Sequence, residues 1–364
     1  MKKVLLLWYF GILASPSYAQ FITIPDTAFV TWLRNNGLDT CMNGNQLDTT
    51  CPAVLTSTSI TCSFLPIHDV TGIQYFKNLR LLICEDDSIT FLPSLPASLT
   101  LINCVGNGLH SLPPLPPGLQ SLTCGVNPLG TLPTLPNTLR VLDCLNDSLT
   151  SLPALPSSLL TLICESNFLH SLPSLPNRLQ WLYCPNNLLD SLPELPNSLT
   201  NFSCEDNALT SLPELPDSMN NFDCGNNPTL MCLPALKRIV DLSFVGTEIT
   251  CLPNYGNVTT SAPPLNTIPL CATGNSSGCS VLTGVNELIN NDFSLKFYPN
   301  PATNEIYIEN PVQGSKFNVY DMTGRIRVFS AVGNEIDISS LAPGMYCLQV
   351  QTAFGNGFGR FIKE

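Results

Sequence analysis

Residues 119–129 of the chain read LQSLTCGVNPL, and residues 131–136 continue with TLPTLP. The same frame returns every twenty residues, with a cysteine at the same offset each time. These cysteines are Cys84, Cys104, Cys124, Cys144, Cys164, Cys184, Cys204 and Cys224. Self-similarity at one fixed period is typical of a solenoid, in which identical supersecondary units stack and bury a continuous core.

Each frame predicts a short strand followed by a turn. In Leu122-Thr123-Cys124, apolar residues alternate with a polar one, which is the pattern of a strand with one buried face. Successive strands then stack into a parallel sheet about 4.8 Å apart. A turn residue follows the strand, and its side chain can hydrogen-bond to backbone N–H and C=O groups that the turn leaves without partners. This position holds Asn107, Asn127, Asn167, Asn187, Asn207 and Asn227, with Asp87 and Asp147 as substitutes.

The return path of each coil is rich in proline, as in residues 112–116, LPPLP. Prolines three residues apart exclude a helix interior and suit polyproline II, which has three residues per turn. With that period, Leu112 and Leu115 share one face and are expected to point inward. A ninth frame starts at Ile239 but has Thr247 in place of the Asn, which indicates a degenerate last coil.

The frame L-x-x-L-x-C-x-x-N-x-L resembles the leucine-rich repeat, with cysteine in place of the third leucine. Its SLPxLPxxL segment is similar to the 20-residue bacterial subclass found in secreted effectors of pathogens. The resemblance covers residues 79–250 and implies a β-rich leucine-rich-repeat solenoid with short parallel strands and a polyproline-II convex side. Some of those effectors carry a ubiquitin-ligase domain, but the residues after the repeats have a different pattern. We therefore expect no enzyme activity and no catalytic residues.

The N-terminus predicts an export signal over residues 1–19. Lys2 and Lys3 precede an apolar run at residues 4–14, and Ser17-Tyr18-Ala19 suits cleavage. The alternative is a membrane anchor, but about eleven apolar residues are too few to cross a bilayer. No transmembrane segment is expected in the mature chain. Residues 20–78 are predicted to form an N-terminal cap and opening coil, and residues 251–291 a C-terminal cap and linker.

Residues 292–364 predict a small C-terminal β-sandwich. Short alternating strands are broken by Gly and Pro turns, beginning with residues 295–301, LKFYPNP. Motifs at residues 319–325, 336–346 and 361–363 follow in order. Together they resemble the sorting domain of the type IX secretion system of Bacteroidota. The resemblance implies that the secretion machinery is a partner and that the protein is secreted or held on the outer cell surface.

The sixteen cysteines allow three interpretations. Spacing of twenty lacks the close pairs of a metal site, and side chains that point the same way fit disulfide geometry poorly. We favour the third interpretation, in which the cysteines of the repeat are buried, unreactive thiols. Near the ends of the solenoid the candidate disulfides are Cys41–Cys51, Cys232–Cys251 and Cys271–Cys279, consistent with an exported protein.

The composition and the motifs of the chain limit the classes of ligand that it can bind. The formal charge is −12, and a nucleic-acid partner needs a basic surface, so nucleic acid is excluded. Glycine-rich phosphate loops and calcium-binding loops are not found, so no metal or cofactor is expected. The three histidines are His68, His110 and His170. The last two hold equivalent repeat positions, which indicates exposed surface residues rather than catalytic ones.

The candidate binding site is the concave face of the sheet. Structural positions repeat from coil to coil, whereas the solvent-facing strand positions vary, as a specific ligand surface requires. Trp181 and Tyr183 are the expected anchors, because aromatic residues dominate binding hot spots. The sequence leaves open a solvated face with no ligand, and a structural adhesion component in which the solenoid is a spacer. The residues proposed to bind a protein or glycan are Trp181, Tyr183, Asp143, Ile163, Glu165, Ser203, Glu205 and Asp223.

Overall fold

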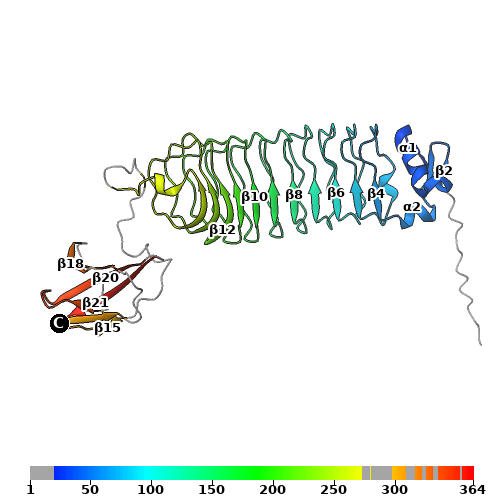
Figure 1. Ribbon diagram of the computed structural model, residues 1–364. Coiled ribbons are helices and arrows are strands. Elements are labelled where there is room, and N and C mark those ends of the chain that lie inside the picture. The colour runs from blue at the N-terminus through cyan, green and yellow to red at the C-terminus, as the bar shows by residue number, and fades with distance from the viewer. Residues whose placement is uncertain are drawn as a thin grey trace, which may run out of the picture. The chain divides into compact units, whose positions relative to one another are not determined.

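A computed structural model of the chain describes residues 20–272, 279, 297–308, 316–321, 325–330, 335–352 and 355–364. The predicted signal peptide and most of the linker lie outside these residues. The chain divides into two compact units, of which the first comprises residues 1–252 and 258–270 and the second residues 253–257 and 271–364. Figure 1 shows the repeats as a regular stack of coils.

The first unit begins with a small cap. Helix α1 starts after Asp26, whose Oδ1 accepts the Phe29 N–H at 2.8 Å, and its apolar face buries Phe29 and Leu33. A disulfide joins Cys41 to Cys51, with Cα atoms 5.6 Å apart. The elements are β1 (Phe21–Thr23), α1 (Thr27–Leu33), the helical turns η1 (Arg34–Leu38) and η2 (Asp39–Cys41), β2 (Met42–Asn43), β3 (Gln46–Asp48) and α2 (Pro52–Thr56).

The repeats form one parallel sheet of eleven strands in chain order. Neighbouring strands in the regular part pair twenty residues apart, for example Leu182 with Phe202. The expected fold class is confirmed. The strands are β4 (Ser59–Thr61), β5 (Leu81–Ile83), β6 (Leu101–Asn103), β7 (Ser121–Thr123), β8 (Val141–Asp143), β9 (Thr161–Ile163), β10 (Trp181–Tyr183), β11 (Asn201–Ser203), β12 (Ser218–Asp223), β13 (Arg238–Ser243) and β14 (Asn257–Ala262). Short turns η3 (Ile73–Tyr75) and η4 (Leu265–Thr267) lie before and after the regular coils.

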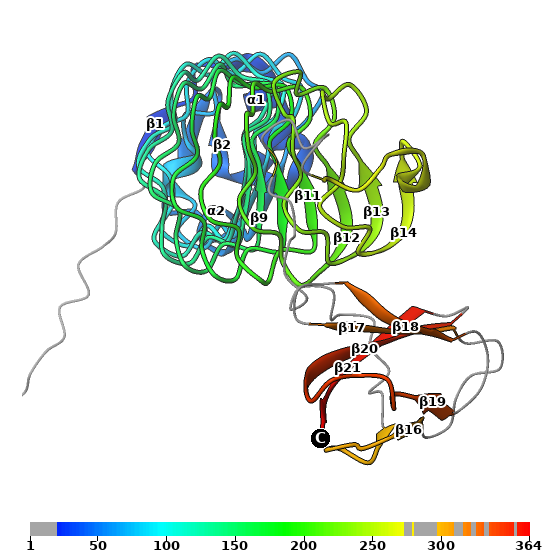
Figure 2. The same cartoon turned by 90° about the vertical axis from the view of Figure 1, so that its left-hand side faces the viewer.

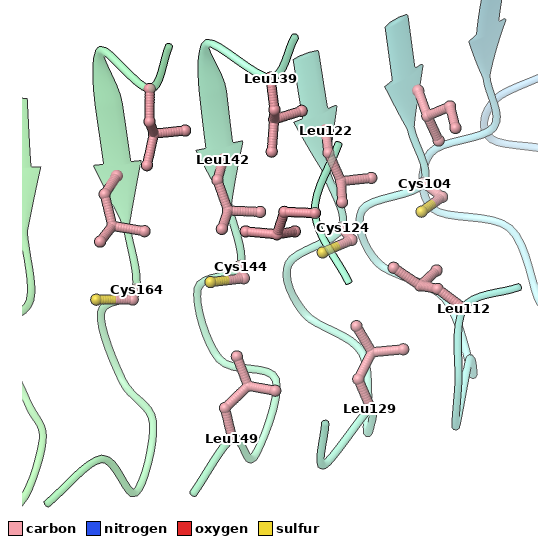
Figure 3. Packing of buried hydrophobic residues seen from close by; sticks show 14 of the residues in the cluster. Cys104, Leu112, Leu122, Cys124, Leu129, Leu139, Leu142, Cys144, Leu149 and Cys164 are labelled. Carbon is pink, nitrogen blue, oxygen red and sulfur yellow. The ribbon is translucent and has the colours of Figure 1, made fainter. Parts of the chain in front are cut away.

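The core of the solenoid is built from leucine and cysteine. In each coil the middle strand residue and the cysteine point inward, as Leu142 and Cys144 do in Figure 3. The return path has neither helix nor strand in coils such as residues 131–136, as the proline spacing predicts. Its leucines close the core from the other side, with Leu112 buried and Leu115 partly buried against the same cluster.

An asparagine ladder ties successive coils together. The Asn167 amide donates to the carbonyls of Cys144, Cys164 and Glu165 at 2.9–3.1 Å. Its Oδ1 accepts the N–H groups of Asp147 and Leu149 in the preceding coil at 3.0 and 2.9 Å. One buried side chain thus satisfies backbone groups of two coils, which would otherwise cost free energy. The residue before the ladder position has positive φ in many coils, as in Asn186 and Asn226, where Asn tolerates the left-handed region.

The second unit contains two antiparallel sheets in the orders β15-β16-β19 and β18-β17-β20-β21. Ile306, Phe317, Val319 and Leu348 lie in one apolar cluster, which is the expected arrangement of a small β-sandwich. Its strands are β15 (Phe297–Tyr298), β16 (Glu305–Ile308), β17 (Lys316–Asp321), β18 (Ile326–Ser330), β19 (Glu335–Asp337), β20 (Gly344–Thr352) and β21 (Gly355–Lys363). None of the helices in the described ranges has the length and hydropathy to cross a bilayer.

Candidate binding face of the solenoid

The solvent-facing side of the solenoid sheet, called the strand face below, presents three columns of side chains. They come from the first and third residues of each three-residue strand segment and from the residue after the cysteine position. Across β5–β13 these columns contain Glu85, Asp143, Glu165, Glu205, Asp223 and Asp241 but no Lys or Arg. These three columns are therefore acidic, whereas Arg80 and Arg140 immediately precede β5 and β8 and Arg238 begins β13.

Trp181 and Tyr183 form an aromatic platform near the middle of the strand face. Both are on β10, two residues apart, so they project from the same side of the sheet. Their ring centroids lie 6.0 Å apart with a tilt of 47°. Trp181 is 45% exposed because its in-register neighbours are the smaller Thr161 and Asn201. A large aromatic surface thus faces solvent on a rigid strand.

Two of the predicted contact residues have different environments. Ile163 is half-buried beside Tyr183, its partner in register on β10, and extends the apolar surface of the platform. Ser203 is only 6% exposed, so the expectation that it contacts a ligand is not supported by its position. Its short side chain lies in register between Tyr183 and Asp223, and these larger groups cover it.

The four predicted acidic residues lie on either side of the platform. Burial raises the pKa of Asp143, and Glu165 adds to the rise, while the Leu145 N–H, 3.3 Å from Asp143 Oδ1, opposes it. Burial also raises the pKa of Glu205, with further contributions from the charges of Asp223, Asp206 and Glu165. Removing these carboxylates from water and placing them near like charges disfavours ionisation. The excess of acidic residues over basic ones in these columns disfavours anionic ligands.

A hollow of about 300 Å³ lies on the strand face at its C-terminal end. It spans β12, β13 and β14, the three six-residue strands of the solenoid sheet, which fan away from the regular stack in Figure 2. The sequence analysis proposed Asp223 as a contact residue but did not predict the hollow, whose β14 side lies in the segment predicted as cap and linker. The available signal was spacing, since Thr260 follows Val240 by twenty residues and donates to its carbonyl at 3.0 Å. The hollow is lined by Asn221, Phe222, Asp223, Asp241, Leu242, Ser243, Thr260, Ser261 and Ala262.

The cysteines of the repeat offer no reactive group. Each is buried, and burial is the main cause that raises the pKa of their thiols, to about 12 for Cys104. Their sulfur atoms face carbonyls of the next coil, as Cys144 Sγ does at 3.4 Å from the Ile163 oxygen. Weakly acidic, enclosed thiols are poor nucleophiles and poor metal ligands.

Four further cysteines were predicted to form disulfides near the C-terminal end of the solenoid. Cys232, Cys251, Cys271 and Cys279 are all disulfide-bonded. The expected pairing of Cys232 with Cys251 and of Cys271 with Cys279 stays a prediction.

Comparison with known proteins identifies the C-terminal region. Residues 296–364 match the family described as a secretion system C-terminal sorting domain. No curated protein sequence matches the chain significantly.

Solved structures of bacterial leucine-rich-repeat proteins are similar to the solenoid. YopM from Yersinia enterocolitica WA-314 is 34% identical, over 51% of this chain and 41% of that protein, with a TM-score of 0.49. The chain thus spans well under half the length of that relative. A Shigella effector leucine-rich-repeat domain is 25% identical, over 50% of this chain and 84% of that domain, with a TM-score of 0.41. The functional domain of InlJ from Listeria monocytogenes, described as including a cysteine ladder, is 17% identical, over 95% of this chain and 99% of that one, with a TM-score of 0.38.

The sorting domain and the repeat architecture together establish the general character of the protein. It is a leucine-rich-repeat protein sorted by the type IX secretion system, and it is secreted or attached to the outer cell surface.

Proposed function

We propose that this exported leucine-rich-repeat protein recognises a protein or glycan ligand through its strand face, which is the predicted concave face. The observation that carries the proposal is the aromatic platform. Trp181 and Tyr183 interrupt columns of smaller residues on a regular sheet, with Trp181 exposed and Tyr183 half-buried beside it. Exposed aromatic side chains on rigid elements bury large area at low entropic cost, so they are typical binding anchors.

The contrast between structural and variable positions supports this proposal. The inward-facing leucines, cysteines and ladder asparagines repeat because each coil needs the same packing and the same hydrogen bonds. The strand-face positions are not needed for core packing or for the hydrogen bonds between coils, yet they combine apolar, aromatic and acidic groups in one continuous surface. A solenoid that acted only as a spacer would not need that combination.

The test replaces Trp181 and Tyr183 by alanine in the exported protein and measures binding to a glycan array and to purified surface proteins. Phe168→Ala is the matched control, because Phe168 is an exposed aromatic residue outside the strands. We expect the platform variants to bind at least tenfold more weakly and the control to bind normally. Equal binding by all variants, or no binding by the wild-type protein, would favour the spacer instead.

A further inference from the structure

We propose that the hollow on β12–β14 is a subsite for a neutral, hydroxyl-rich ligand, a glycan whose chain continues along the strand face toward Trp181 and Tyr183. This inference rests on the proposed function and assigns its ligand class.

The polar groups of the hollow are arranged as a grid. Asn221 pairs in register with Asp241, and Asp223 pairs with Ser243. Thr260 on β14 continues the first row, since its hydroxyl donates to Asp241 Oδ1 and to the Val240 carbonyl. Strand spacing separates neighbours in a row by about 4.8 Å, and two residues along a strand separate the rows by about 7 Å. At these spacings, neighbouring side chains can each hydrogen-bond to a different hydroxyl group of one sugar ring.

The chemistry of the lining suits hydroxyl groups. Carboxylates accept hydrogen bonds, an amide both donates and accepts, and Ser and Thr hydroxyls adapt to either role. Asp223 Oδ1 accepts the Gly225 N–H at 2.9 Å, which fixes the direction of this carboxylate. The Thr260 hydroxyl fixes Asp241 in the same way. Groups oriented before binding lower the entropic cost of recognising a polar ligand.

Other ligand classes fit the hollow less well. Anions such as phosphate would face two carboxylates and no cation among the lining residues. Within the described part of the strand face, no three Asp, Glu, His or Cys side chains bring their ligand atoms together. A volume near the lower end of ligand pockets favours a small group, and the Asn, Asp, Ser and Thr side chains of the lining can hydrogen-bond to it.

The aromatic platform lies on the same surface and within reach. Tyr183, Ser203 and Asp223 are in register on three consecutive strands, so the platform and the hollow are about 10 Å apart. Sugar rings present apolar C–H faces as well as hydroxyl edges, and aromatic rings offer the flat apolar surface that such faces pack against. A glycan of a few units can therefore occupy both sites.

The competing occupant is a cationic protein segment drawn to the acidic strand face. It would depend on charge, whereas a neutral glycan depends on hydrogen bonds and packing. Charge-driven binding weakens steeply with salt, because the Debye length falls from about 10 Å at 0.1 M to about 3 Å at 1 M. Asp241→Asn keeps an oxygen that can accept the Thr260 hydroxyl but removes one charge, so it should weaken the binding of a cationic segment.

The experiment uses the full chain and an array of neutral oligosaccharides of two to four glucose, mannose, galactose or N-acetylglucosamine units, with hexalysine as the cationic probe. The tightest neutral probe is then titrated against Asn221→Ala and Thr260→Val, with Thr123→Val on β7 as the matched control far from the hollow. We expect each hollow variant to bind about tenfold more weakly, since each loses about one hydrogen bond. Thr123→Val should bind within about threefold of wild type, and 0.5 M salt should change the affinity for the neutral probe little.

Each contrary outcome has a separate meaning. Binding of hexalysine alone, abolished by salt and by Asp241→Asn, would overturn the glycan assignment and leave strand-face recognition standing. Glycan binding that is lost in Trp181→Ala but unchanged in Asn221→Ala and Thr260→Val would overturn the hollow as a subsite. Glycan binding unaffected by any of these variants would overturn both the subsite and the proposed function.

Discussion

Asp147 occupies a ladder position that asparagine holds in most other coils, and replacing it by asparagine should stabilise the solenoid. The side chain is fully buried and accepts the Asn127 N–H at 2.9 Å through Oδ1. Oδ2 lies 3.6 Å from Cys124 Sγ. A carboxylate has no N–H to donate to the carbonyls of Cys124 and Cys144, as Asn167 donates to those of Cys144 and Cys164. Burial raises the pKa of Asp147 to about 7.

The magnitude follows from this pKa. The unfolded chain releases the proton near pH 4, whereas the folded protein holds it to about pH 7. The free energy of unfolding therefore falls as pH rises from about 4 to about 7, and is constant above that range. A difference of three pKa units corresponds to about 4 kcal/mol at pH 8. Asp147→Asn removes this cost and restores amide donors, so its stability advantage over wild type should shrink by about 4 kcal/mol between pH 8 and pH 4.

The assay is urea unfolding followed by circular dichroism at pH 4, 6 and 8, on proteins with equal m-values. Differences between variant and wild type cancel the other titrating groups. Asn187→Asp is the matched control, because Asn187 donates to the carbonyls of Cys164, Cys184 and Pro185. This control should lose stability, more at pH 8 than at pH 4. A less stable Asp147→Asn at pH 8, or an advantage independent of pH, would refute the reasoning.

Three further predictions concern other parts of the chain. Val126 has φ of 58°, which is strained for a β-branched residue, so Val126→Asn should raise the free energy of unfolding by about 1 kcal/mol in urea melts. Lower stability would show that the lost Val126 packing outweighs the strain. Iodoacetamide at pH 8 should leave Cys104 and Cys144 unmodified until urea unfolds the protein, because both thiols are buried and burial raises their pKa; mass spectrometry reports the modification. Deleting residues 296–364 should keep the protein inside the cell envelope, and surface antibody labelling equal to wild type would contradict this.

Most of the architecture was predictable from the sequence because each coil repeats the same short sequence pattern. Leu122, Cys124 and Asn127 recur at fixed offsets, so one coil predicts the strand, core and turn of the others. The proline spacing likewise predicts the open return path with Leu112 and Leu115 facing the core. The strand-face positions of Trp181 and Tyr183 follow from strand alternation alone.

What the sequence could not show depends on neighbours in adjacent coils. Ser203 is covered because Tyr183 and Asp223 lie beside it in register, and its own coil gives no sign of this. The hollow needs β14, whose residues lack the repeat frame and join the sheet only through pairing in the folded chain. Exposure and pKa depend on what surrounds a side chain in three dimensions. The repeat therefore determined the scaffold, and packing between coils decided which of its surface groups are available to a ligand.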